Sequence, residues 1–214
     1  MTRSQLITDL ASLGPWLNNL SSSETQQSEI FSAELTEAFQ AVISREIYRN
    51  GWFEPHAVKD SLAGISSWLN TEVLTSFAAP YVFQGFRPSL GLILAGNLPM
   101  VGFHDMLCGL LSGYRLQIKL SSDDQQLIPL LLRGLTELNP VYAELIHVNP
   151  QKLSGFDAVI GTGSDSTLLH FQSYFKHIPH LLRGNRTSVA ILRGDETPHE
   201  LHALGNDIFQ YFGR

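Results

Sequence analysis

The stretch from Leu90 to Ser122 constrains the fold more than any other part of the chain. It begins with the continuous apolar run 90–95, which is typical of a strand buried on both faces. A turn with Gly and Pro (96–99) follows, and the next apolar segment, 101–111, has helical length. Residues 115–120 have the pattern of a second strand. Strand, helix and strand within about thirty residues predict a βαβ unit with a right-handed crossover.

Strand and helix patterns continue to alternate after this unit. We predict strands at 144–148, 156–160 and 188–192, and helices at 123–138, 166–175 and 198–212, the last one capped by Thr197. Together with the first two strands, this makes a mostly parallel, doubly wound α/β sheet over residues 90–214.

Residues 1–89 are predicted to form a separate helical region. The expected helices are 6–13, which ends at Gly14-Pro15, a longer one from the Ser21–Glu24 cap to about Arg49, one that Pro55 begins, and 71–78. The aromatic residues Tyr81, Phe83 and Phe86 in the connection that follows are expected to pack in the core.

Charge and composition exclude several classes of protein. The net charge of -6 leaves no basic stripe to neutralise nucleic-acid phosphates. The first residues lack the apolar core of a signal peptide, and no apolar run approaches the length of a membrane span. A single cysteine excludes a disulfide framework, and the eight histidines show no ligand spacing, so we expect no metal. These features predict a cytoplasmic protein.

Two polar side chains follow the strands of the βαβ unit. Asn97 and Lys119 are both expected at the carboxyl edge of the sheet, where ligands bind in open parallel sheets. The Asn97 amide either bonds its own turn or donates to a developing oxyanion. Lys119 either is solvated or binds a nucleotide ribose or phosphate, with Ser121 and Ser122 as further donors.

The segment Gly161-Thr162-Gly163-Ser164 is a second candidate contact. It is predicted as a turn between a strand and a helix, where small residues and free N–H groups suit a phosphate. It matches neither established glycine-rich phosphate motif, and a plain tight turn remains open.

Other reactive residue types carry less information. His104 and Cys108 are spaced to meet on one helix, but the leucines around Cys108 predict a small core residue rather than a nucleophile. Arg183 and Arg186 flank a Gly-Asn turn, and they either bind an anion or are solvated.

The chain resembles a known enzyme family from about Leu90 to Arg214. The segments that carry the resemblance are LAGNLPMVGFHDMLCGLLSG, QIKLSSDD, FDAVIGTGSDSTLLHFQSYF, LLRGNRTSVAILRGDET and LGNDIFQYFG. They are similar to motifs of the bioluminescence-type (LuxC-type) fatty acyl-CoA reductases of the aldehyde dehydrogenase superfamily. The resemblance implies an aldehyde-dehydrogenase-like, Rossmann-type parallel sheet with helices on both faces. It also implies reduction of a long-chain acyl-CoA to the aldehyde through an acyl-cysteine, with NADPH rather than NADH as the cofactor.

The resemblance assigns roles to individual residues. Asn97 matches the oxyanion-hole asparagine, and Lys119 matches the lysine that binds the adenosine ribose. Ser122 stands where NAD-preferring relatives often carry a glutamate, and an uncharged residue there suits a 2′-phosphate, although Asp123 follows directly. Gly163 and Ser164, with Gly161 before them, match the pair near the pyrophosphate.

Two departures from the family pattern shape the expected function. Arg183 stands about where hydrolysing relatives carry a water-activating glutamate, which suits a reductase. In the family, FQYFG runs directly into a Gly-Cys pair that carries the nucleophile, and this chain stops at Gly213-Arg214. We therefore expect the cofactor-binding portion of the enzyme without its catalytic domain, inactive alone and forming homo-oligomers. The alternative is a stand-alone nucleotide-binding or oligomerisation module.

Overall fold

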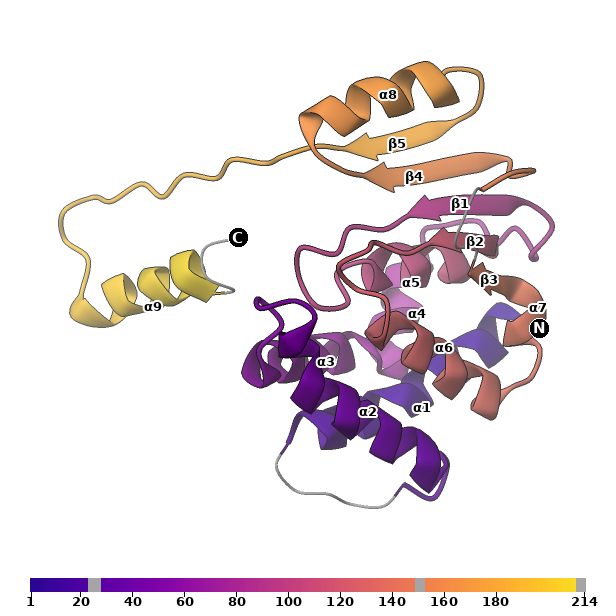
Figure 1. Cartoon of the computed structure of the whole chain (residues 1–214), viewed down its shortest axis with the longest axis horizontal. Helices are drawn as coiled ribbons and strands as arrows, with labels where there is room; N and C mark the ends of the chain where they lie inside the picture. The colour runs from indigo at the N-terminus through magenta and orange to yellow at the C-terminus, as the bar shows by residue number, and fades with distance from the viewer. Residues whose placement is uncertain (23–27, 149–152, 211–214) are drawn as a thin grey trace.

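The computed structural model describes residues 1–22, 28–148 and 153–210 and contains a five-stranded parallel sheet (Figure 1). The strands are β1 Ser89–Ile93, β2 Arg115–Lys119, β3 Ile146–Val148, β4 Ala158–Thr162 and β5 His180–Arg183. Their order is β3-β2-β1-β4-β5, and every neighbouring pair is parallel. The predicted α/β sheet is therefore confirmed.

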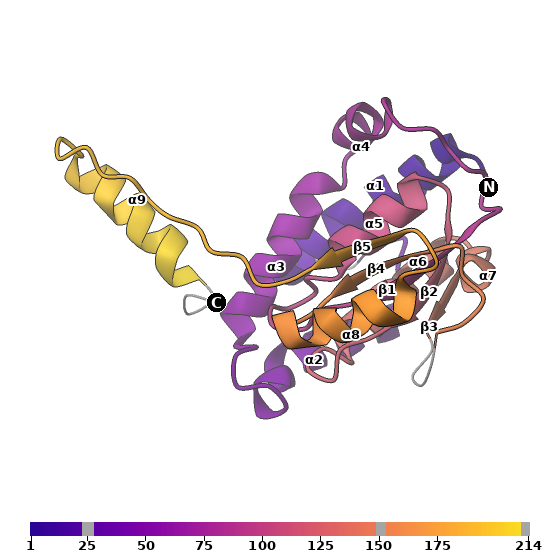
Figure 2. The same ribbon diagram turned by 90° about the horizontal axis from the view of Figure 1, so that it is seen from above.

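Helices cover both faces of this sheet, as predicted (Figures 1 and 2). Helix α5 (Phe103–Leu111) packs on one face, where Gly109 lets it approach Leu90 and Leu116 closely. Helix α8 (Asp165–Phe175) covers the other face, where Phe171 lies against Gly161. The alternation of side chains along each strand supplies both apolar surfaces.

The N-terminal helices form a further layer beneath α5. They are α1 Arg3–Ser21, α2 Ala33–Arg45, the 3-10 turn η1 Glu46–Tyr48, α3 Pro55–Trp68 and α4 Thr71–Ala78. Helices α6 Leu127–Leu138 and α7 Tyr142–Leu145 connect β2 to β3, and α6 packs against α1 and α2. One continuous cluster of buried apolar residues runs from α1 to β3, so the helical region and the sheet share a core.

The predicted end of the first helix at Gly14-Pro15 is wrong, because α1 continues through both residues. An interior proline removes one backbone hydrogen bond and costs about 3 kcal/mol. Leucines on both sides of it are fully or nearly fully buried, and Ser66 Oγ donates to the Gly14 carbonyl at 2.8 Å. Packing against α3 thus outweighs the local signal.

Several other predicted boundaries are corrected. The predicted start of the second helix falls partly in residues 23–27, which lie outside the described residues, and α2 begins only after its N-cap Ser32. Residues 142–145, overlapping a predicted strand, form α7, and β3 is correspondingly short. The helix predicted from residue 123 begins at Leu127, because the Asp124 side chain turns inward instead. Phe83 and Phe86 pack against the core, whereas Tyr81 is exposed.

The predicted strand at 188–192 is also wrong. The fifth strand is His180–Arg183, and residues 184–192 form no helix or strand, with Val189 and Ile191 exposed to solvent. Helix α9 (Pro198–Phe209) follows, and its predicted Thr197 cap is confirmed as a capping box with Glu200. None of its residues is buried, and both views show it far from the sheet (Figures 1 and 2). A strand pattern needs a neighbouring strand, and the described residues provide none here.

Candidate functional site

The carboxyl ends of four strands meet at one edge of the sheet. Ile93 of β1 lies opposite Lys119 of β2 on one side and Gly161 of β4 on the other. Thr162 of β4 is in turn paired with Arg183 of β5. From β1 the chain proceeds to β2 and β3 on one side of the sheet, and it then continues with β4 and β5 on the other side of β1. Open α/β sheets bind ligands at such a switch point in the strand order, which here lies between β1 and β4. The loop that contains Asn97 and the side chain of Lys119 therefore lie at the same edge, as the sequence predicts.

The loop after β1 presents Asn97 to solvent. Within the described part of the chain, the Asn97 side chain has no hydrogen-bond partner, so it does not bond its own turn. The loop is held by other groups. Gly96 lies so close to Ser121 that an added Cβ would be 2.5 Å from its side chain, and Met100 adopts a positive φ of 55°. The Asn97 amide is thus available at the edge of the sheet.

Asp124 supports this loop from below. Its Oδ2 accepts a hydrogen bond from the Met100 N–H at 2.7 Å, and its side chain is buried, with Oδ1 unpartnered among the described groups. Burial raises the pKa of Asp124 to about 6, although the N–H groups of Met100 and Leu127 lower it. The nearby Glu46 carboxyl raises it further. Asp124, whose ionisation is disfavoured by burial, therefore fixes the backbone of the loop that carries Asn97.

Lys119 lines an apolar cavity of about 270 Å³ between the sheet and α8. Its ammonium is the charged group at this cavity, and the side chain is exposed. The other lining residues are Ile93, Leu153, His170, Phe171, Tyr174 and Phe175. An ammonium beside aromatic walls suits a ligand with both a flat apolar part and hydroxyl groups.

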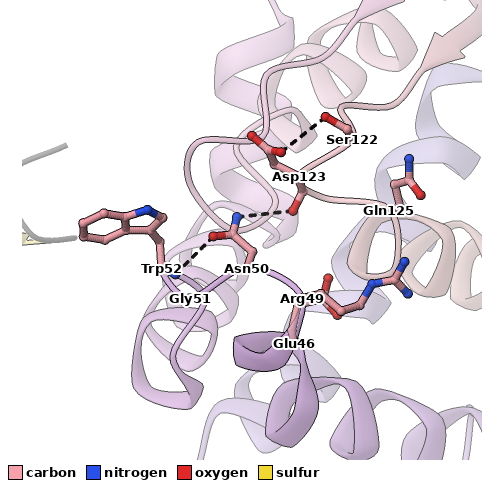
Figure 3. Close-up of a pocket in the computed structure, with 8 residues that line it drawn as sticks. All are labelled: Glu46, Arg49, Asn50, Gly51, Trp52, Ser122, Asp123 and Gln125. Atoms are coloured by element: carbon pink, nitrogen blue, oxygen red, sulfur yellow. Dashed lines mark hydrogen bonds between the residues drawn. The ribbon is translucent and has the colours of Figure 1, made fainter.

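A second cavity, of about 540 Å³, lies where the N-terminal region meets the loop after β2 (Figure 3). It is lined by Glu46, Arg49, Asn50, Gly51, Trp52, Ser122, Asp123 and Gln125. Ser122 Oγ donates to Asp123 Oδ1 at 3.3 Å, and the Asp123 N–H donates to Ser121 Oγ at 3.2 Å. Sequence reasoning found the two serines and missed Arg49 and Trp52, because these residues are about seventy positions away along the chain.

The glycine-containing segment after β4 differs from its predicted form. Strand β4 extends through Thr162, so buried Gly161 belongs to the strand, and its small size admits Phe171 and Leu182. Gly163 and Ser164 form the connection, and Ser164 Oγ is the N-cap of α8, accepting from the Thr167 N–H at 3.4 Å. The N-terminal end of α8 nevertheless lies at the same edge as Lys119.

Arg183 is bound within the protein. Its guanidinium donates to Asp105 Oδ1 at 2.6 Å, and the Asp105 side chain is 7% exposed. This ion pair joins the end of β5 to the first turn of α5, and Arg183 is thereby committed to a carboxylate of its own chain. Arg186 is exposed and has no ion pair with the described residues.

Comparison with known proteins identifies the family. The family model described as acyl-CoA reductase (LuxC) matches residues 83–212, which is more than half of the chain. The chain belongs to the LuxC acyl-CoA reductase family. No curated protein matches it. Membership implies an oxidoreductase of acyl-CoA, and it suggests a nicotinamide cofactor and an acyl-CoA substrate.

Cys108 is the one cysteine of this LuxC-family sequence. It is half-buried rather than fully in the core, and its Sγ lies 3.8 Å from His104 Nε2, so the expected meeting of these two side chains is confirmed. Burial raises the pKa of the thiol, the Asp105 carboxylate raises it further, and Arg183 lowers it. A thiol kept protonated in this way is a poor nucleophile.

Crossing a lipid bilayer requires a helix that is both long and apolar. Within residues 1–22, 28–148 and 153–210, no helix combines the length and the apolar character that crossing a membrane requires.

Proposed function

We propose that this chain is the cofactor-binding portion of an NADPH-dependent reductase that converts a long-chain acyl-CoA to the fatty aldehyde. The observation that carries the proposal is the shared carboxyl edge of β1, β2 and β4, where Lys119 lines a cavity and the Asn97 amide is exposed. Family membership supports the reaction class.

The residues at the edge fit the parts of a dinucleotide. The Lys119 ammonium would donate to ribose hydroxyls, while Phe171 and Tyr174 offer apolar walls to the adenine. Ser121 and Ser122 add hydroxyl groups beyond β2, and that of Ser122 would exchange its bond to Asp123 for one to the cofactor. Gly163 and Ser164, at the N-terminal end of α8, would lie near the pyrophosphate, where free N–H groups favour an anion. The bound cofactor supplies the reducing equivalents.

Asn97 has a different role in the proposal. A carboxamide N–H stabilises the oxyanion that develops when a thiolate attacks a thioester carbonyl. The loop that carries Asn97 is fixed by the bond from Met100 to Asp124 and by the contact of Gly96 with Ser121. Such a fixed donor needs little reorganisation during the reaction.

We further propose that these 214 residues do not catalyse the reduction by themselves. The proposed acyl transfer requires a reactive thiolate, and Cys108 lies beside His104 on α5 with a raised pKa. A nucleotide-binding module without catalysis is the alternative function, and the raised pKa of the Cys108 thiol favours it as well. A second protein that carries the matching nucleophile can be added in trans. Reduction of acyl-CoA by the mixture would support the reductase over the module.

Binding of NADPH tests the central proposal. We expect saturable binding, followed through nucleotide fluorescence, and a roughly tenfold or larger loss of affinity in Lys119→Ala, because a charged hydrogen bond is removed. Lys176→Ala is the matched control, since this exposed lysine lies at the other end of α8. Equal affinities of the two variants would contradict the assignment of Lys119. Consumption of NADPH with a long-chain acyl-CoA would contradict the proposed inactivity.

A further inference from the structure

We infer that Arg49 and Asp123 act in opposite directions on the cofactor's 2′-phosphate, with Arg49 attracting it and Asp123 repelling it. Both side chains line the cavity beyond the end of β2 (Figure 3). The inference rests on the proposed function, because it requires the adenosine ribose to bind near Lys119. It adds a contribution from the N-terminal helical region to cofactor selection.

The cavity is formed by two segments far apart in the sequence, 46–52 and 122–125, which a hydrogen bond connects. Asn50 Nδ2 donates to the Asp123 carbonyl at 3.4 Å, and Asn50 Oδ1 accepts from the Trp52 N–H at 3.1 Å (Figure 3). The next residue, Phe53, is completely buried, and its N–H donates to the Asn50 carbonyl. The loop that bears Arg49 is thereby fixed against the loop that bears Ser122, on the same edge as Lys119.

The Arg49 guanidinium forms no ion pair with the described residues. In contrast, Arg133 pairs with Glu34 and Glu137, and Arg183 pairs with Asp105. Guanidinium groups bind phosphate oxygens in a two-pronged geometry, which makes an unpaired one at a cavity wall suited to a phosphate. Ser122 also lines the cavity, and its hydroxyl donates to Asp123 Oδ1.

Asp123 supplies the opposing charge. Its carboxylate is exposed at the cavity and accepts from Ser122 Oγ. An acid after the second strand of a dinucleotide fold binds the ribose hydroxyls and disfavours a 2′-phosphate. Glu46 also lines the cavity, and its side chain is buried; burial raises its pKa, and the positive charge of Arg49 lowers it without an ion pair between the two. The preference between NADPH and NADH therefore depends on the balance between Arg49 and Asp123.

The test compares the affinities of NADPH and NADH for the whole chain. We expect Arg49→Gln to weaken NADPH binding by about ten- to a hundredfold and to leave NADH nearly unchanged, since only NADPH has the 2′-phosphate. Asp123→Asn should strengthen NADPH binding relative to NADH. Arg49→Lys, which keeps the charge, should retain most of the NADPH affinity. Arg45→Gln is the matched control, because this exposed arginine ends α2 and does not line the cavity.

The outcomes separate this inference from the proposed function. If wild-type protein binds both nucleotides and Arg49→Gln weakens them equally or not at all, the inference is overturned and the proposed function stands. If wild-type protein binds neither nucleotide, the proposed function fails and the inference fails with it. An unchanged ratio in Asp123→Asn would remove the repulsive half of the inference. Circular dichroism of each variant shows whether a loss of binding reflects unfolding.

Discussion

Folding buries the Asp124 carboxyl group, which accepts a hydrogen bond from the Met100 N–H. Its pKa rises from 3.8 to about 6 on folding. Well below pH 3.8 the group is protonated in both states, and stability is lost between pH 3.8 and about 6. Over this range the unfolded chain ionises freely, while the folded chain ionises only at a cost. The buried neighbour Glu46, whose pKa is also raised by burial, adds a loss of the same sign.

We predict that Asp124→Asn changes this pH dependence. The two pKa values, 3.8 and about 6, correspond to roughly 3 kcal/mol of unfolding free energy. The variant should therefore gain up to about 3 kcal/mol relative to wild type between pH 4 and pH 7. Urea unfolding of both proteins at the two pH values measures the change. A constant difference in stability between wild type and variant would contradict the raised pKa.

Gly14 is a second residue whose environment makes a sharp prediction. A Cβ at this position would lie 2.5 Å from the Leu69 carbonyl oxygen, and a backbone atom cannot move away cheaply. Gly14→Ala should therefore destabilise the fold by roughly 1–3 kcal/mol through overpacking. Gly64→Ala, in α3 with open space around it, should instead stabilise by about 0.5–1 kcal/mol. Shifts of the urea midpoint in opposite directions are expected, and shifts in the same direction would contradict this packing.

At the scale of the element, α9 depends on its own sequence. No residue of α9 is buried, so local capping and propensity must supply most of its stability. Its N-terminus has a capping box in which Thr197 and Glu200 bond each other's backbone N–H groups. Helices α3 and α5, in contrast, are stabilised by the buried residues on their inner faces.

Two substitutions should therefore change the stability of α9 and leave the core unchanged. Thr197→Ala removes the cap and should reduce helix stability by about 1 kcal/mol. Gly205→Ala, where an added Cβ meets nothing within 4 Å, should increase it by about 0.5–1 kcal/mol. Amide hydrogen exchange of residues 201–209 measures both effects. Equal changes in the exchange of β1 and β2 amides would show that α9 unfolds together with the core.

At the scale of the whole molecule, the sheet and the N-terminal helices share one core, while the C-terminal part presents apolar groups to solvent. Val189 and Ile191 are more than four-fifths exposed, and Phe209 of α9 is 75% exposed. Large apolar side chains exposed to this extent are characteristic of interaction sites. We therefore propose that the chain self-associates through this C-terminal surface, residues 189–209.

The proposed self-association has a direct test. Analytical ultracentrifugation should show an average mass that rises with protein concentration, and the double variant Val189→Asp, Ile191→Asp should reduce this rise. Lys59→Asp, on α3 and outside the C-terminal surface, is a control for the added charge. A wild-type protein that stays monomeric at high concentration would contradict the proposal. These substitutions should leave the thermal midpoint within about 2 °C of wild type, since both residues are exposed.

The βαβ unit, the parallel α/β class and the shared edge of Asn97 and Lys119 could be predicted from the residues alone. These features depend on apolar periodicity and on the rule that parallel strands end at a common edge, and both can be found in neighbouring residues. The predicted cap at Thr197 is local in the same sense, although the strand boundary at Gly161 was not predicted correctly.

The remaining features depend on contacts that form only in the folded chain. Helix α1 passes Pro15 because α3 packs against it, and residues 188–192 form no strand because no described strand lies beside them. The cavity lined by Arg49 and Ser122 is bridged by a hydrogen bond from Asn50 to the Asp123 carbonyl. Each of these features is a contact between residues far apart in the chain, whose free energy no local pattern contains.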